Sequence, residues 1–447
     1  MEMNDLVIAS LDDHIIEPPT LFDQHLTREQ KQFAPSFQTD ADGIDYWLFD
    51  GQRSGNVGLN AVVGRPKAEY GMEPVSLNQM REGCYDVGKR IDDMNVNGVL
   101  ASLPFPTVVG MDGIIFHKYQ DKKQALTLLR AYNDWHVDEW CAAAPGRFIP
   151  NPLVPTWDMQ ATVEEVKRLS KKGVHSVCFH DNPANRGLPS PHNAYWDPFW
   201  KVCAEHDVVI SMHHGTGNAA QSPSPEAPID AWITCMSMSI SLALADLLHL
   251  PALNTYKNLK LALIESGVGW VPYVLERADF ILKQHGHWTH STFGGRLPSE
   301  VYRDHFLSTF VHRDGGVTPD AIAYLGDHTI CYEMDYPHSD CQWPNGPEEL
   351  WSFIGTLPEA TIDRMTHGNA FRDYHFDAFG MMGGRQNCTV KALRAQAAHV
   401  DTSEQSKPGF KASKGTGRGG RVTTSDIFSM FAKLEELNEE KQAETAD

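Results

Sequence analysis

The chain passes from the apolar run Leu6-Val7-Ile8-Ala9 directly into Leu11-Asp12-Asp13-His14-Ile15-Ile16-Glu17-Pro18. The polar groups at the end of this run lose water in a folded core and must each find a partner. Side chains alternate along a strand, so Asp12 and His14 face one side and Asp13 faces the other. A carboxylate beside an imidazole makes half of a divalent-metal site. The simpler alternative is an ordinary polar turn before the two prolines that follow.

Composition narrows the class of protein. With 447 residues, 41% hydrophobic and 21% charged, the chain suits one large α/β barrel with insertions or two globular domains. The formal net charge of −20 argues against a nucleic-acid partner, which needs a basic surface. We see no apolar run of about 18 residues and no signal peptide, and therefore expect no membrane span and a cytoplasmic location. The eight cysteines include no Cys-x-x-Cys pair, so reduced thiols are expected.

Apolar runs alternate with helical patterns along most of the chain, which is typical of βαβ units and a parallel sheet. Strands are expected at Leu6–Ser10, Val99–Leu103, Phe148–Pro150, Val174–Phe179, Val208–Met212, Leu259–Ile264, Phe306–Val311 and Thr329–Met334. Helices are expected at Val87–Met94, 117–143, 158–171, Trp196–Glu205, 230–249 and Val271–Leu282. Eight continuously apolar strands predict a (β/α)₈ TIM barrel. A doubly wound sheet is the alternative, but it would not need polar residues at so many strand ends.

The domain organisation follows from shifts in composition. We expect the barrel to occupy residues 1–378, with a polar, glycine-rich insertion at about 25–75 that forms a lid after the first strand. Residues 379–447 form a C-terminal extension, in which the composition of 402–421 predicts a flexible linker. Residues 426–441 predict an amphipathic helix, which either docks on the barrel or a second subunit or stays exposed. A homo-oligomer, most simply a dimer, is expected.

Chemistry-bearing side chains follow several of the predicted strands. They are Asp12 and His14 after the first, His180 after the fourth, His213 after the fifth, Glu265 after the sixth and Asp335 after the eighth. In a parallel barrel all strand C-termini open on one face, so these residues would converge on one rim. Each could instead be a hydrogen-bonded core residue or a loop cap, but their convergence favours a metal.

These segments resemble the amidohydrolase superfamily, in particular the amidohydrolase-related branch that also holds aminocarboxymuconate-semialdehyde and resorcylate decarboxylases. The resemblance covers roughly residues 5–378 and rests on Asp12-Asp13-His14-Ile15-Ile16-Glu17-Pro18, His213-His214-Gly215-Thr216-Gly217, Glu265-Ser266-Gly267-Val268-Gly269-Trp270, Asp335-Tyr336-Pro337-His338-Ser339-Asp340 and Gly368-Asn369-Ala370-Phe371-Arg372. It implies one divalent metal, Zn²⁺ ahead of Mn²⁺ or Fe²⁺, held by Asp12, His14, His213 and Asp335.

Three positions depart from the superfamily pattern. Asp12 stands where a first-strand histidine is usual, Glu265 stands where relatives often carry a histidine, and His180 replaces the lysine of binuclear members. A single metal is therefore expected. The first of these departures matches the decarboxylase branch.

The predicted function is a metal-dependent hydrolase of a small organic substrate, aromatic or ring-cleaved, that uses an activated water. Asp335 would move the proton of the water, while Glu265 and His338 orient substrate or carry protons. His180, His214 and Trp270 are the expected substrate contacts. The same residues would serve a non-oxidative decarboxylase of an aromatic or enoic acid. A third hypothesis is a metal-bound scaffold protein without catalytic activity.

Overall fold

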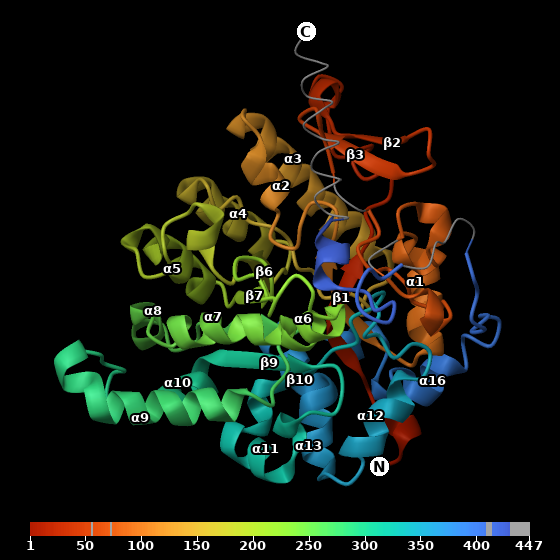
Figure 1. Cartoon of the computed structure of the whole chain (residues 1–447). Coiled ribbons are helices and arrows are strands. Elements are labelled where there is room, and N and C mark those ends of the chain that lie inside the picture. The colour runs from red at the N-terminus through yellow and green to blue at the C-terminus, as the bar shows by residue number, and fades with distance from the viewer. Residues whose placement is uncertain (55–56, 72–73, 408–413, 430–447) are drawn as a thin grey trace.

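Two parallel sheets form the centre of the molecule in the computed structural model (Figure 1), which describes residues 1–447 except 55–56, 72–73, 408–413 and 430–447. The first sheet pairs β1 (Ala9–Ile15) with β5 (Ala101–Pro106). The second has the order β10-β9-β8-β7-β6, with bounds Ile330–Tyr332, Phe306–Phe310, Leu261–Ile264, Val209–His213 and Ser176–Phe179. All of these pairs are parallel, so the predicted α/β class is confirmed.

Backbone contacts connect the two sheets at both ends. On one side, the Ile149 N–H donates to the Ser102 carbonyl at 2.8 Å, and the Cys178 N–H donates to the Pro152 carbonyl at 2.8 Å. The expected third strand, 148–150, is therefore present as a single bridge and a short extended stretch. On the other side, the Asp335 N–H donates to the Asp12 carbonyl at 2.7 Å. The C-terminal end of β10 thus lies beside β1.

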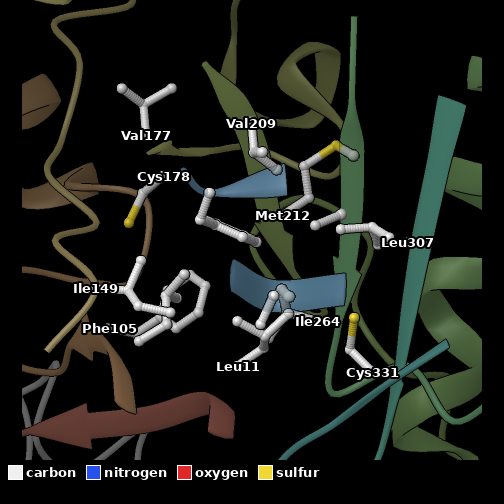
Figure 2. Packing of buried hydrophobic residues seen from close by; sticks show 14 of the residues in the cluster. Leu11, Phe105, Ile149, Val177, Cys178, Val209, Met212, Ile264, Leu307 and Cys331 are labelled. Atoms are coloured by element: carbon white, nitrogen blue, oxygen red, sulfur yellow. The ribbon is translucent and has the colours of Figure 1, made fainter. Parts of the chain in front are cut away.

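One apolar core lies among these strands. Figure 2 shows side chains from the stretch at Ile149 and from every parallel strand meeting there, including Leu11, Phe105, Met212, Ile264, Leu307 and Cys331. All of these side chains are at most 2% exposed. The burial of apolar area, at about 25 cal/mol per Å², is the main force that holds the strands together.

Two strands run further than their sequences predict. The first strand was expected at Leu6–Ser10, but β1 covers Ala9–Ile15, so the polar motif lies inside it. This is possible because neighbouring strands supply partners for its polar groups. The second was expected to stop before Pro104, yet β5 continues to Pro106. The Ser102 N–H points away from β1 and bonds the Arg147 carbonyl, and the two prolines share that alternation. Their missing N–H groups therefore cost no bond to β1.

Helices cover the sheets, and several match their predicted ranges. These are α1 (Val87–Val96), α4 (Met159–Ser170), α5 (Asp197–Glu205) and α9 (Val271–Thr289), the last longer than expected. The remaining ones are α8 (Pro251–Thr255), α10 (Pro298–His305), α11 (Pro319–Leu325), α12 (Gly346–Ile354), α13 (Glu359–Asp363), α14 (Asn369–Asp373), α15 (Ala378–Met381) and α16 (Val390–Arg394).

Two predicted helices are interrupted. The range 117–143 divides into α2 (Ile114–Lys118) and α3 (Lys122–Trp135), followed by a π-helical turn at His136–Trp140. The break occurs because the Asp121 carboxylate accepts the N–H groups of Lys123 and Gln124 and caps a new helix. The range 230–249 divides into α6 (Ile229–Met236) and α7 (Ile240–Leu247) around a 3₁₀ turn.

The stretch from α6 through α7 is the one helical segment of the described residues that could cross a membrane by length and composition. Its best window has a mean hydropathy of 1.2, and 22% of that window is buried. No membrane span was expected from the sequence, because it contains no run of about 18 consecutive apolar residues. A single stretch of this kind is weak evidence for a membrane span.

The insertion at 25–75 forms structure of its own. It contains a three-stranded antiparallel sheet of β2 (Ser36–Thr39), β3 (Asp45–Phe49) and β4 (Gln52–Arg53). Farther along, the N–H groups of Val62 and Val63 donate to the Pro337 carbonyl at 3.1 and 3.0 Å. This part of the insertion therefore contacts the loop that follows β10.

The C-terminal extension packs on the rest of the chain where it is described. The Val390 N–H donates to the Leu6 carbonyl at 2.8 Å, and the Gln405 N–H donates to the Gly64 carbonyl at 2.9 Å. A short helix covers 424–429, and Phe428 packs against Trp232 of α6. Most of the predicted helix 426–441 and part of the predicted linker 402–421 lie outside the described residues.

Candidate metal centre

Three side chains from two strands meet at the centre of the parallel sheets. Asp12 and His14 come from β1, and His213 is the last residue of β7. His14 Nε2 lies 3.4 Å from Asp12 Oδ1, and His213 Nε2 lies 3.5 Å from Asp12 Oδ2. One potential ligand atom from each residue lies within 4.8 Å of the others. These residues are 0–1% exposed, so bulk solvent does not reach them.

Two further groups share members with the first. Asp335 Oδ1 lies 3.4 Å from His14 Nε2 and 2.8 Å from His338 Nδ1, so His14, Asp335 and His338 form a second group. Glu265 Oε2 lies 3.1 Å from His213 Nε2 and 2.6 Å from His214 Nε2. These three residues form the third group. The structure therefore joins all four predicted ligands, Asp12, His14, His213 and Asp335, into one continuous cluster.

Many polar atoms of this cluster are buried without a hydrogen-bond partner. They are both carboxylate oxygens of Asp12, both ring nitrogens of His14, Nε2 of His213, Oδ1 of Asp335 and Nε2 of His338. A buried donor or acceptor left unpaired costs about 1–3 kcal/mol, and native structures contain few of them. Lone pairs on carboxylates and imidazoles are the ligands of divalent transition metals. The residues present therefore fit a bound cation.

Burial and neighbouring charges shift the pKa values of the cluster residues. Removal from water raises the pKa of Asp12 and of Asp335 and lowers the pKa of His14 well below its usual value. For His213 the carboxylates of Asp12 and Glu265 outweigh burial, and its pKa rises. His14 is therefore neutral, which is the form of imidazole that binds metals.

Asp13 points away from the cluster, as strand alternation predicts. Its Oδ1 accepts the N–H of Tyr336 at 2.9 Å. Burial raises the pKa of Asp13 to about 7. Asp13 therefore ties β1 to the loop after β10, while its two neighbours in the motif face the cluster.

Two buried residues near the site were not singled out from the sequence. Arg90 of α1 donates from Nη2 to the His14 carbonyl at 2.5 Å, and no short-range pattern marks it. Glu333 Oε2 accepts the N–H of Glu265 at 3.0 Å, and burial raises the pKa of Glu333 well above its usual value. Strand alternation does not identify Glu333, because β10 ends at Tyr332 and Asp335 has a positive φ of 54°.

Two predicted substrate contacts lie outside the three groups. His180 Nδ1 lies 2.8 Å from Asp112 Oδ2, and its Nε2 lies 2.9 Å from Thr156 Oγ1, so both ring nitrogens are engaged. The Trp270 indole N–H donates to the Ser266 carbonyl at 2.7 Å. His214 does join the cluster through Glu265. A substrate role for these residues stays a prediction.

A parallel α/β fold with a carboxylate–imidazole cluster at its strand ends defines a metal-binding class of enzyme. A family model described as Amidohydrolase matches residues 23–376, and the chain belongs to this family of metal-dependent enzymes. The match begins after the β1 motif, so Asp12 and His14 are assigned by their place in the structure. No curated protein matches the chain.

Several solved structures share the fold. An amidohydrolase from Mycobacterium avium subsp. paratuberculosis K-10 is 18% identical with a TM-score of 0.64, and covers 82% of this chain and 97% of its own. 5-Carboxyvanillate decarboxylase from Sphingomonas paucimobilis is 17% identical with a TM-score of 0.57, covering 83% and 99%. A dihydroxybenzoic acid decarboxylase from Polaromonas sp. JS666, with bound manganese and the inhibitor 2-nitroresorcinol, is 18% identical with a TM-score of 0.52, covering 83% and 97%.

Proposed function

We propose that the chain is a metal-dependent hydrolase that acts on a small organic substrate at the strand C-termini. The observation that carries this proposal is the set of converging, buried and unpartnered oxygen and nitrogen atoms of Asp12, His14, His213 and Asp335. Unpaired buried atoms of this kind destabilise the folded state unless a ligand such as a cation pairs with them. Ionisable groups with shifted pKa values also gather at active sites.

The proposal also covers the closure of the barrel, the role of the insertion and the oligomeric state. We infer that the strands close into a (β/α)₈ barrel, with the stretch 148–152 between β5 and β6 and with β10 beside β1. The backbone bonds Cys178–Pro152 and Asp335–Asp12 support this closure. We propose that the insertion acts as a lid. Its contacts to the Pro337 carbonyl support this role. We also propose a homodimer and a cytoplasmic location, which light scattering and cell fractionation would test.

The four predicted ligands would hold one divalent cation, with Zn²⁺ proposed ahead of Mn²⁺ and Fe²⁺. When bound, such a cation supplies Lewis acidity that lowers the pKa of water and polarises a carbonyl.

Side chains of the cluster would carry out proton transfer and orient the reacting groups. Asp335 accepts the proton of the attacking water and returns it to the leaving group. His338, 2.8 Å from Asp335, orients that carboxylate. Glu265 and His214, 2.6 Å apart, form a second proton-carrying pair, in which Glu265 also contacts His213. Glu265 stands at the position after the sixth predicted strand, where relatives often carry a histidine.

Non-oxidative decarboxylation of an aromatic or enoic acid is the second candidate. Two observations favour it: the Asp12-x-His14 pair of β1 and the structural neighbours that are decarboxylases, one of them with bound manganese. In this reaction Asp335 would protonate the carbon that loses CO₂. The third hypothesis is a non-catalytic scaffold, which would bind metal and convert no substrate.

A substrate screen on the metal-loaded full chain separates these candidates. Amides, lactones and cleaved-ring diketones are assayed for hydrolysis, and hydroxybenzoates are assayed for CO₂ release. We expect hydrolysis in wild type and a loss of at least about 10²-fold in Asp335→Asn, since general acid–base catalysis contributes about 10²–10⁴-fold. Glu205→Ala, at the exposed end of α5, is the matched control and should keep full activity. CO₂ release alone would replace the hydrolase proposal with the decarboxylase.

A further inference from the structure

A chain of hydrogen bonds leads away from the loop that carries Asp335 and His338. Tyr336 lies between these two residues in sequence, and its hydroxyl donates to Asp93 Oδ2 at 2.6 Å. Asp93, in α1, is 2% exposed. Arg81 Nε lies 2.8 Å from both carboxylate oxygens of Asp93. A partly buried ion pair outside the metal cluster therefore anchors the loop.

The ring of Tyr336 connects this anchor to β1. The Arg90 guanidinium lies 4.2 Å from the centre of that ring, and the same guanidinium donates to the His14 carbonyl at 2.5 Å. Gly83 packs directly against this pair and has no room for a side chain. A β-carbon there would lie 2.6 Å from the Tyr336 hydroxyl oxygen and would overlap the Asp93 carboxylate. Arg90 thus links the ring of Tyr336 to β1, which carries Asp12 and His14.

The C-terminal extension holds the outer end of the anchor. Arg81 Nη2 donates to the Asp401 carbonyl at 3.0 Å, and the Arg81 guanidinium lies 4.1 Å from the centre of the Trp343 ring. The Trp343 indole N–H donates in turn to the Asp93 carbonyl at 3.2 Å. The Amidohydrolase match ends at residue 376, so Asp401 belongs to the part of the chain beyond it.

We propose that Tyr336, Asp93 and Arg81 are positioning residues, which hold Asp335 and His338 at the distance from β1 that a cation requires. This inference rests on the proposed function, because it takes the cluster to be a metal centre. Hydrogen bonds behind a ligand fix its orientation, and their loss typically weakens metal affinity by about 10–100-fold. Tyr336 acts through the backbone of its neighbours and does not itself face the cluster.

The test measures metal affinity in the full chain, independently of turnover. Mn²⁺ binding is measured by equilibrium dialysis, and the visible absorption bands of the Co²⁺-loaded protein report ligand geometry. Tyr336→Phe removes one hydroxyl and should weaken Mn²⁺ binding by about tenfold or more and shift the cobalt bands. Asp93→Asn keeps an acceptor for Tyr336 but loses the charge facing Arg81, and should have a weaker effect of the same kind.

Tyr302→Phe is the matched control. The Tyr302 hydroxyl is also buried and donates to Ser308 Oγ at 2.9 Å, but neither residue belongs to the cluster. It should leave the Mn²⁺ dissociation constant and the cobalt bands unchanged. Circular dichroism confirms that each variant is folded, and Asp93→Asn replaces Tyr336→Phe as the deciding variant if Tyr336→Phe does not fold.

The outcomes separate the two proposals. A folded Tyr336→Phe variant with wild-type Mn²⁺ affinity and cobalt bands would overturn the positioning role and leave the proposed function standing. An equal loss in Tyr302→Phe would overturn it as well. A wild-type chain that binds neither Mn²⁺ nor Co²⁺ would overturn both.

Discussion

At the residue scale, strand alternation predicted which side chains of the first motif meet and which do not. Asp12 and His14 face the cluster, while Asp13 bonds the Tyr336 N–H. Arg90 could not be found this way, because its role depends on a carbonyl 76 positions earlier in the chain. Local periodicity reports a side chain's face, whereas a long-range bond to a backbone carbonyl leaves no local pattern.

The neighbouring acids Asp12 and Asp13 give a matched pair of substitutions. Asp12→Asn removes a carboxylate that faces two imidazoles, so we expect it to lower bound metal by at least about tenfold. Asp13→Asn keeps an oxygen that can accept the Tyr336 N–H and should retain the wild-type metal content. Elemental analysis of both purified variants measures this. Loss of metal from Asp13→Asn with retention in Asp12→Asn would reverse the assignment of the two faces.

At the scale of elements, the sequence located most strands and helices but misplaced several ends. The apolar run of Leu6–Ser10 suggested an early strand, yet β1 continues to Ile15 because its polar residues find partners on adjacent strands. The helix at 117–143 reads as one amphipathic face, and only the capping carboxylate of Asp121 reveals the break. The π-helical turn at His136–Trp140 follows from tertiary contacts: His136 Nε2 accepts the Asn151 N–H at 3.0 Å.

His136 gives this π-helical turn a pH dependence. Burial lowers the pKa of His136 to about 3, below its ordinary value of 6.5. Its contribution to stability is therefore complete above pH 6.5. As the pH falls from 6.5 toward 3, the unfolded state binds a proton that the folded state does not, and the unfolding free energy decreases by up to about 1.4 kcal/mol per pH unit.

His136→Gln keeps an acceptor for the Asn151 N–H but cannot be protonated. Urea unfolding of both proteins between pH 7 and pH 4 measures the difference. The variant should lose stability less steeply than wild type as the pH falls. Parallel curves for the two proteins would show that His136 titrates normally in the folded state.

At the scale of the whole molecule, the sequence predicts an α/β fold with polar residues at the strand ends, because that pattern repeats along the chain. It could not show how the extension packs, since its contacts are distant in sequence. Val390 bonds Leu6, Asp401 bonds Arg81, and the segment at 422–428 contacts the start of α6. Composition shows only that residues 402–421 are polar and glycine-rich, and the partners come from the fold.

We propose that the cluster around Asp12, His14, His213 and Asp335 is a metal centre. Equilibrium dialysis of the metal-stripped full chain against Zn²⁺, Mn²⁺ and Fe²⁺, followed by elemental analysis, tests it most directly. We expect one tightly bound divalent cation per chain. A folded wild-type chain that retains none of the three metals would contradict it.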